Sequence, residues 1–188
     1  PDFAQIYTHA KKSGLLVSVF TNGTLIDDTT LALWRDLPPY LIEISLYGYH
    51  PATYAQATGV SDARAHRNCF RAVEKLARAS FPVKLKTMVT TDTLAELDLL
   101  KQYSTDLGVD FRFDTMITAG LYGSKNPCAT RIDPQFVLSL ENDEEKLKKG
   151  WVPFLNAAEP LSPRKTSFGC GAGMKSFFVT PDGRLSLC

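Results

Sequence analysis

Apolar residues follow two patterns along the first part of the chain. Short apolar runs of strand length fall at residues 15–20, 41–47, 83–89 and 109–116. Before and between them, apolar residues recur every three or four positions, as on one face of a helix, at residues 3–14, 29–37, 63–79 and 93–107. This order predicts an α/β fold in which parallel strands are joined by crossover helices.

Two connections in this part of the chain carry local signals. Thr93-Leu-Ala-Glu96 has the spacing of a capping box, in which Glu96 returns to the start of its own helix. The segment after the second strand contains three residues that are common in turns, Gly48, Pro51 and Gly59. Since Gly and Pro commonly mark turns, a loop is predicted before the helix that starts near residue 63.

The alternation ends near residue 118. The remaining chain predicts a loop at 119–131, a helix at 134–149, a proline-rich connector at 150–167 and a β-hairpin with strands at 176–180 and 184–187. The turn of that hairpin is Pro181-Asp182-Gly183. The predicted domains are a sheet with helices at 1–118, a linker with one helix at 119–167 and a hairpin domain at 168–188.

Polar residues occupy every second position of the last three predicted parallel strands. They include Ser45, Lys84, Lys86, Asp110, Arg112 and Asp114. An antiparallel sheet with one face in water shows the same alternation, but helices between the strands favour the polar lumen of an open barrel. In such a lumen, the lysines and Arg112 can hold a carboxylate, Asp110 or Asp114 an ammonium group and Ser45 a hydroxyl.

Reaction sites of parallel α/β sheets lie at the carboxyl ends of the strands. Two polar turns fall there, Thr21-Asn22-Gly23 after the first strand and Tyr47-Gly48 after the second. Both turns are therefore candidate parts of a binding site.

Composition narrows the class of protein. Hydrophobic residues make up 44% and charged residues 22%, as in an ordinary globular protein, and the net charge of +1 gives no reason to expect a nucleic-acid partner. No apolar run reaches the ~20 residues that cross a bilayer, so no membrane partner is expected. Four widely spaced cysteines in a chain with a full core do not resemble a disulfide-stapled secreted scaffold, which predicts a reducing cytoplasm.

The cysteines carry the remaining candidate chemistry. Cys170 and Cys188 bracket the hairpin in the pattern C-x12-G-x4-C, and the hairpin brings its ends together. Spacing alone leaves a shared metal centre, a disulfide and two unrelated thiols open. Cys69 is predicted to be a small buried hydrophobe in a helix. Cys128 is expected to be a free loop thiol, with a third cluster ligand as the alternative.

The hairpin resembles the start of a SPASM domain, the cysteine-rich extension of many radical S-adenosylmethionine (radical SAM) enzymes. Cys170, Gly183 and Cys188 match its opening pattern. The resemblance implies that the two cysteines ligate an auxiliary iron–sulfur cluster. The later SPASM motif C-x2-C-x5-C-x3-C is not found in this sequence.

Residues 1–118 are similar to the radical SAM barrel. Residues 19–26 resemble its third strand and turn, and residues 42–48 its fourth strand, where a polar residue such as Ser45 contacts the cofactor. The family's C-x3-C-x2-C cluster motif is not found, nor is its glycine-rich motif. The expectation is therefore an internal piece of a longer enzyme: part of a (β/α) barrel followed by the start of a SPASM domain, without ligands for the catalytic cluster.

The resemblance implies a reaction for the parent enzyme. Such enzymes cleave S-adenosylmethionine reductively at a [4Fe-4S] cluster, giving a 5′-deoxyadenosyl radical that abstracts hydrogen, and the SPASM-bearing ones often modify peptides or proteins. The implied partners are a peptide or protein substrate and a reductant such as ferredoxin or flavodoxin. The expected cofactor-binding residues are Thr21, Asn22, Gly23, Ser45, Lys84 and Lys86.

Two other hypotheses remain open. One is a non-catalytic ligand-binding remnant of a barrel, in which the cysteine pair holds zinc or no metal. The other is an ordinary (β/α) barrel enzyme with acid–base chemistry at Asp110 or Asp114.

Overall fold

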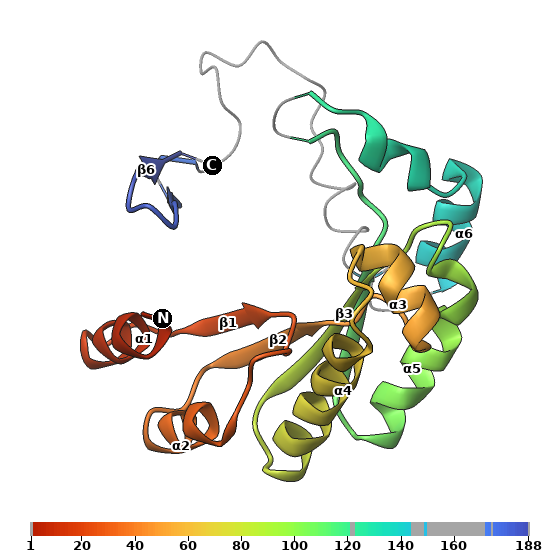
Figure 1. Ribbon diagram of the computed structural model, residues 1–188. Coiled ribbons are helices and arrows are strands. Elements are labelled where there is room, and N and C mark those ends of the chain that lie inside the picture. The colour runs from red at the N-terminus through yellow and green to blue at the C-terminus, as the bar shows by residue number, and fades with distance from the viewer. Residues whose placement is uncertain (1, 121–122, 144–148, 150–171, 174, 188) are drawn as a thin grey trace. The chain divides into compact units, whose positions relative to one another are not determined.

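The computed structural model describes residues 2–120, 123–143, 149, 172–173 and 175–187 (Figure 1). The chain forms two compact units, Pro1–Val137 and Leu138–Cys188. Each unit is described by itself below.

The first unit is built on a four-stranded parallel sheet in the order β1-β2-β3-β4. Its strands are β1 (Ser18–Thr21), β2 (Leu41–Ser45), β3 (Val83–Met88) and β4 (Asp110–Asp114). Because neighbouring strands run parallel, the antiparallel reading of the polar alternation is wrong, and the predicted α/β fold with a partial barrel is confirmed.

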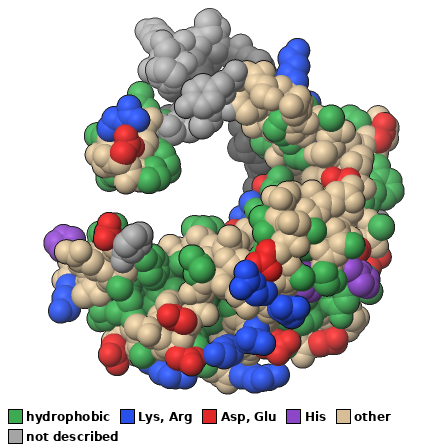
Figure 2. Space-filling view, viewed as in Figure 1, with side chains coloured by type: hydrophobic (Ala, Val, Ile, Leu, Met, Phe, Trp, Pro, Cys, Tyr) green, Lys and Arg blue, Asp and Glu red, His purple; other side chains and the backbone are tan. Residues whose placement is uncertain are grey.

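Helices connect the strands, and α2, α4 and α5 lie along one face of the sheet (Figure 1). The helical elements are α1 (Phe3–Lys12), α2 (Asp28–Asp36), α3 (Pro51–Thr58), α4 (Ala63–Arg78), η1 (Leu94–Glu96), α5 (Leu97–Asp106), η2 (Asn126–Thr130) and α6 (Pro134–Asp143). None of the helices in the described ranges is long and apolar enough to span a bilayer. On the surface shown in Figure 2, basic and acidic side chains are interspersed.

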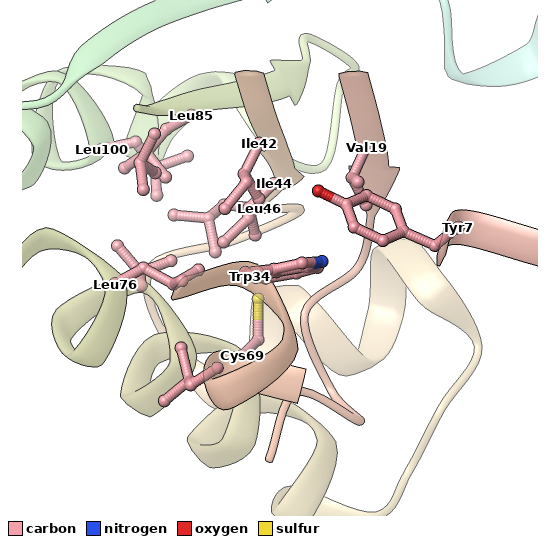
Figure 3. Packing of buried hydrophobic residues seen from close by; sticks show 13 residues of the cluster. Tyr7, Val19, Trp34, Ile42, Ile44, Leu46, Cys69, Leu76, Leu85 and Leu100 are labelled. Carbon is pink, nitrogen blue, oxygen red and sulfur yellow. The ribbon is translucent and has the colours of Figure 1, made fainter. Parts of the chain in front are cut away.

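The hydrophobic core lies between the apolar face of the sheet and these helices. Ile42 and Ile44 of β2, with Leu46 just after it, are fully buried. Figure 3 shows these side chains gathered near Trp34 and Leu76. Burying each large aliphatic side chain stabilises the fold by about 1.5–3 kcal/mol. The alternation along β2 therefore fixes which face of the sheet meets the helices.

The loop predicted after β2 contains a helix. Pro51 occupies the first turn of α3, where its fixed φ suits a helix and its missing N–H costs nothing. Gly59 ends α3 in the left-handed conformation, with φ of 70°. Two of the three residues that signalled a loop, Pro51 and Gly59, are therefore at the ends of a short helix.

The predicted capping box at Thr93 and Glu96 is wrong. The Thr93 side chain makes no cap hydrogen bond. Instead, its hydroxyl donates to the carbonyl of Met88 at 2.7 Å and accepts from the N–H of Thr90 at 2.9 Å. Glu96 binds the segment that follows β2, and the expected helix begins as the 3₁₀ turn η1 before α5.

The second unit contains the predicted hairpin. Strand β5 (Phe178–Val179) pairs antiparallel with β6 (Leu185–Ser186), and the N–H of Thr180 donates to the carbonyl of Arg184 at 2.9 Å. Gly183 adopts a φ of 82° in the turn. The proposed ligands Cys170 and Cys188, the connector at 150–167 and much of the helix expected beyond α6 lie outside the described residues.

Candidate functional site

The register of the parallel strands brings the predicted polar residues onto one face of the sheet. Five Cα pairs define this face: Glu43 with Lys84, Ser45 with Lys86, Lys84 with Asp110, Lys86 with Arg112, and Met88 with Asp114. The face points away from the apolar core because successive residues of a strand point to opposite sides. We call Glu43, Ser45, Lys84, Lys86, Asp110, Arg112 and Asp114 the polar face.

An ion pair with a buried carboxylate crosses the polar face. Arg112 donates from Nε to one carboxylate oxygen of Glu43 at 2.8 Å and from Nη2 to the other at 2.7 Å. Glu43 is only 5% exposed, and these hydrogen bonds raise the pKa of Arg112 above its usual value. The carboxylate that Arg112 holds is thus supplied by the chain itself, and bidentate geometry makes this a strong pairing.

Lys86 and Asp114 form a looser pair at the carboxyl end of the polar face. Lys86 Nζ lies 3.8 Å from Asp114 Oδ2, and both side chains are partly exposed. Asp114 Oδ1 also accepts from the N–H of Met116 at 3.0 Å. Ser45 stands opposite Lys86 in the register. An ammonium, a carboxylate and a hydroxyl are therefore within one small region of the sheet.

The turn after β1 is built by its own side chains. The side-chain oxygen of Asn22 accepts from the N–H of Thr24 at 3.2 Å and from its hydroxyl at 2.9 Å. The hydroxyl of Thr21 accepts from the N–H of Gly23 at 3.1 Å. Gly23 has a φ of 74° and is buried, and a Cβ there would lie 3.3 Å from Ile44. The Thr-Asn-Gly sequence thus shapes this turn.

The turn after β2 lies directly against α3. A Cβ on Gly48 would lie 2.6 Å from the backbone nitrogen of Tyr54 and 2.9 Å from the backbone of Thr53. No side chain fits at this distance from a neighbouring backbone. Gly48 therefore lets the chain turn closely from β2 into α3.

A cavity of about 350 Å³ opens at the carboxyl ends of β2, β3 and β4. It is lined by Tyr47, Ala57, Met88, Thr90, Asp92, Thr93, Met116, Ile117, Thr118 and Thr130. The predicted residues Ser45, Lys84 and Lys86 are not part of this lining, although Met88 follows Lys86 on the same face of β3. The cavity offers hydroxyl groups beside methionine and isoleucine, a mixture that accommodates a ligand with polar and apolar parts.

Glu96 connects two of the loops at this edge of the sheet. Its carboxylate accepts hydrogen bonds from the N–H groups of Tyr49 and His50, and from the side chains of His50 and Thr53. Burial alone raises the pKa of Glu96, but these hydrogen bonds outweigh it, and the pKa lies below its ordinary value. The sequence assigned Glu96 to its own helix, so this contact was missed.

Cys69 and His66, two further residues of types that can act as ligands, are structural. Cys69 is fully buried, and burial raises the pKa of its thiol to about 12, so it is predominantly protonated at neutral pH. His66 places Nε2 2.8 Å from the carbonyl oxygen of Tyr49 and packs on Phe70. Cys128 is a partly buried free thiol in η2. Within the ranges that the structure describes, no three His, Cys, Asp or Glu residues form a metal-binding group.

No protein-family model matches the chain, and no curated protein sequence matches it. Solved structures do match. The crystal structure of Streptococcus suis SuiB covers 100% of this chain with a TM-score of 0.69 at 12% identity. SuiB bound to S-adenosylmethionine matches 82% of this chain with a TM-score of 0.58 at 13% identity. SuiB bound to precursor peptide SuiA matches 82% of this chain with a TM-score of 0.55 at 13% identity.

These likenesses concern the fold. The chain spans 46% of the length of SuiB in the first match, and 33% and 32% in the two others.

Proposed function

We propose that this chain is part of a radical SAM enzyme with a SPASM domain, which modifies a peptide or protein by hydrogen abstraction. The observation that carries the proposal is the likeness in fold to SuiB along the whole chain, since SuiB has been crystallised with S-adenosylmethionine and with a precursor peptide. The motifs at residues 19–26 and 42–48 and the hairpin pattern support the same family independently of the fold.

The polar face suits S-adenosylmethionine chemically. The methionyl part of this molecule carries a carboxylate and an ammonium group close together. Lys86 supplies a cation and Asp114 an anion 3.8 Å apart, so the two ends of the amino acid can each meet an opposite charge. Ser45 lies opposite Lys86 and is our candidate partner for a ribose hydroxyl. Lys84 and the turn at 21–23 complete the proposed binding residues.

The described residues do not fit the catalytic [4Fe-4S] cluster. None of their His, Cys, Asp and Glu side chains gather as a metal site, and the chain contains no C-x3-C-x2-C sequence. The share of the reaction that we assign to this chain is therefore to bind and orient S-adenosylmethionine and to line the cavity at the carboxyl ends of the strands. Radical formation is assigned to ligands in another part of the proposed longer enzyme.

Cys170 and Cys188 are our proposed ligands for an auxiliary iron–sulfur cluster. The described part of the hairpin supports this, because β5 and β6 pair antiparallel between the two cysteines. Thiolates are the usual ligands of such clusters. The electron donor that we propose, a ferredoxin or flavodoxin, follows from the family resemblance alone.

Binding of S-adenosylmethionine to this chain tests the cofactor site. We expect saturable binding by isothermal titration calorimetry and about tenfold weaker binding by Lys86→Met, since one charge-assisted hydrogen bond is lost. The matched control is Lys12→Met on the exposed end of α1, which should bind like the parent chain. A chain that binds no S-adenosylmethionine would remove the cofactor site and leave a barrel for another ligand.

The reaction itself is tested on the longer enzyme that we propose. After anaerobic reconstitution with iron and sulfide, it should form 5′-deoxyadenosine from S-adenosylmethionine under dithionite. Cys170→Ala and Cys188→Ala should lower the iron content and spare this cleavage. If neither substitution changes the iron content, the two cysteines are not cluster ligands.

A further inference from the structure

The carboxylate of Glu96 lies where two loops of the candidate site meet. Its side chain is only 12% exposed although it is charged. One oxygen accepts from the N–H of Tyr49 at 2.6 Å and of His50 at 3.1 Å. The other accepts from the Thr53 hydroxyl at 2.5 Å and lies 2.9 Å from Nδ1 of His50. We call this group, Glu96 with Tyr49, His50 and Thr53, the Glu96 junction.

The Glu96 junction caps α3 from outside that helix. His50 is the N-cap residue of α3, and its own side chain makes no cap hydrogen bond. The first N–H groups of a helix lack partners within the helix, and a negative charge beside them is favourable. Glu96, 46 residues further along the chain than His50, supplies the missing acceptor for the entry to α3.

The junction connects two walls of the cavity. Tyr47, from the loop after β2, and Thr93, from the loop after β3, both line it. Tyr47 precedes the first residue of the junction by two positions, and Gly48 between them lies so close to α3 that a Cβ there would be 2.6 Å from the backbone nitrogen of Tyr54. Thr93 is tied to the end of β3 through the carbonyl of Met88. The position of one wall relative to the other therefore depends on Glu96.

We infer that Glu96 is a positioning residue: its ionised carboxylate holds Tyr47 and the start of α3 against the loop after β3, and so sets the affinity of the site for its ligand. Glu96 itself does not line the cavity. The part of the inference that concerns the ligand rests on the proposed function. The part that concerns the position of the loop between β2 and α3 does not depend on that function.

Hydrogen–deuterium exchange on this chain tests whether Glu96 holds the segment between β2 and α3 in place. Glu96→Gln keeps the shape of the side chain but replaces one acceptor oxygen by an amide donor, which cannot accept from a backbone N–H. We expect the amides of Tyr49 and His50 to exchange at least about tenfold faster in this variant, because the hydrogen bonds that protect them are weakened. The control is Asp98→Asn, an exposed carboxylate in the first turn of α5, which should leave these rates unchanged.

Ligand binding and pH provide the second readout. The proposed cofactor residue Ser45 lies two positions before Tyr47, so a shift of this loop should reach the cofactor site. Glu96→Gln should therefore weaken binding of S-adenosylmethionine about tenfold, and Glu96→Asp should restore part of it, since a shorter carboxylate still accepts. In the parent chain, protection of Tyr49 relative to its intrinsic exchange rate should fall as pH drops below 4.5 and Glu96 becomes protonated. In Glu96→Gln, this pH dependence should disappear. If Glu96 had only a packing role, the protection of Tyr49 would not depend on pH in this way in the parent chain.

The outcomes separate the two proposals. Unchanged exchange at Tyr49 and His50 in Glu96→Gln would overturn the positioning role, whatever the ligand result. Faster exchange in a chain that binds no S-adenosylmethionine would support the positioning role and overturn the proposed function. If Glu96→Gln does not fold, Thr53→Val, which removes one donor, and the pH profile of the parent chain decide the question.

Discussion

Glu43 and Arg112 are 69 residues apart in the sequence, and their side chains meet by two hydrogen bonds of 2.8 and 2.7 Å. Glu43 belongs to β2 and Arg112 to β4, so the contact passes over β3, which lies between them in the sheet. It joins strands that share no backbone hydrogen bonds.

Removing the cation of this pair should destabilise the first unit. Arg112→Met leaves the buried Glu43 carboxylate without its partner, which should cost about 1–3 kcal/mol in the free energy of unfolding, because Arg112 is itself 38% exposed and water can replace part of the pairing. The double variant Glu43→Leu/Arg112→Met should lose less than Arg112→Met alone, because no charge is then left buried. Urea denaturation of the parent chain and of both variants measures these differences. Arg64→Met, in the exposed pair with Asp62, is the control and should not move the midpoint.

Gly48 should not tolerate a side chain. In Gly48→Ala, the new Cβ would lie 2.6 Å from the backbone nitrogen of Tyr54, and the strain of moving α3 should cost about 1–3 kcal/mol in the free energy of unfolding. The control is Gly120→Ala, whose Cβ would have no neighbour closer than 3.7 Å. Equal thermal midpoints for the two variants would show that α3 does not lie against Gly48 in solution.

Cys69 should be unreactive in the folded chain. Burial raises the pKa of its thiol to about 12, and the thiolate is the form that reacts with iodoacetamide. At pH 8, mass spectrometry should find Cys128 alkylated well before Cys69, and unfolding in urea should remove the difference. Rapid alkylation of Cys69 without urea would contradict its place in the core.

The stability supplied by the Glu96 junction should depend on pH. The pKa of Glu96 is lowered in the folded chain from an ordinary value of 4.5, so the unfolded chain takes up the proton first as pH falls. The stability that Glu96 contributes is therefore complete above about pH 4.5, and it is lost as the pH falls through the lower pKa that Glu96 has in the folded chain. The difference in thermal midpoint between the parent chain and Glu96→Gln should shrink between pH 6 and pH 3. A constant difference over this range would contradict the prediction.

Much of the fold could be predicted from the sequence because its signals are local. Apolar residues at every second position of β2 and β3 predicted which face is buried, and the helices between strands predicted parallel pairing. The turn at 181–183 predicted the hairpin in the same way. The ends of α3 were misread since Pro51 and Gly59 suit a loop and a short helix equally well.

The candidate site depended on contacts that no local signal contains. The sequence placed Ser45, Lys84 and Lys86 on one face, and none of them lines the cavity. Tyr47, which the sequence placed at the end of a strand, does line it, together with Thr93, which the sequence assigned to a capping box. Family resemblance supplied the proposed cofactor and the roles of Cys170 and Cys188, and these remain predictions.

The sequence by itself determined the order of the four strands and of the helices between them apart from α3, as well as the parallel sheet and its polar face, because hydrophobic periodicity acts within a few residues. Only the tertiary structure decided that Glu43 pairs with Arg112 and that Glu96 caps α3 instead of its own helix. The physical reason is that a charged side chain takes the partner that strand register and helix packing bring within hydrogen-bonding distance. In these two cases, that partner lies more than 40 residues away in the chain.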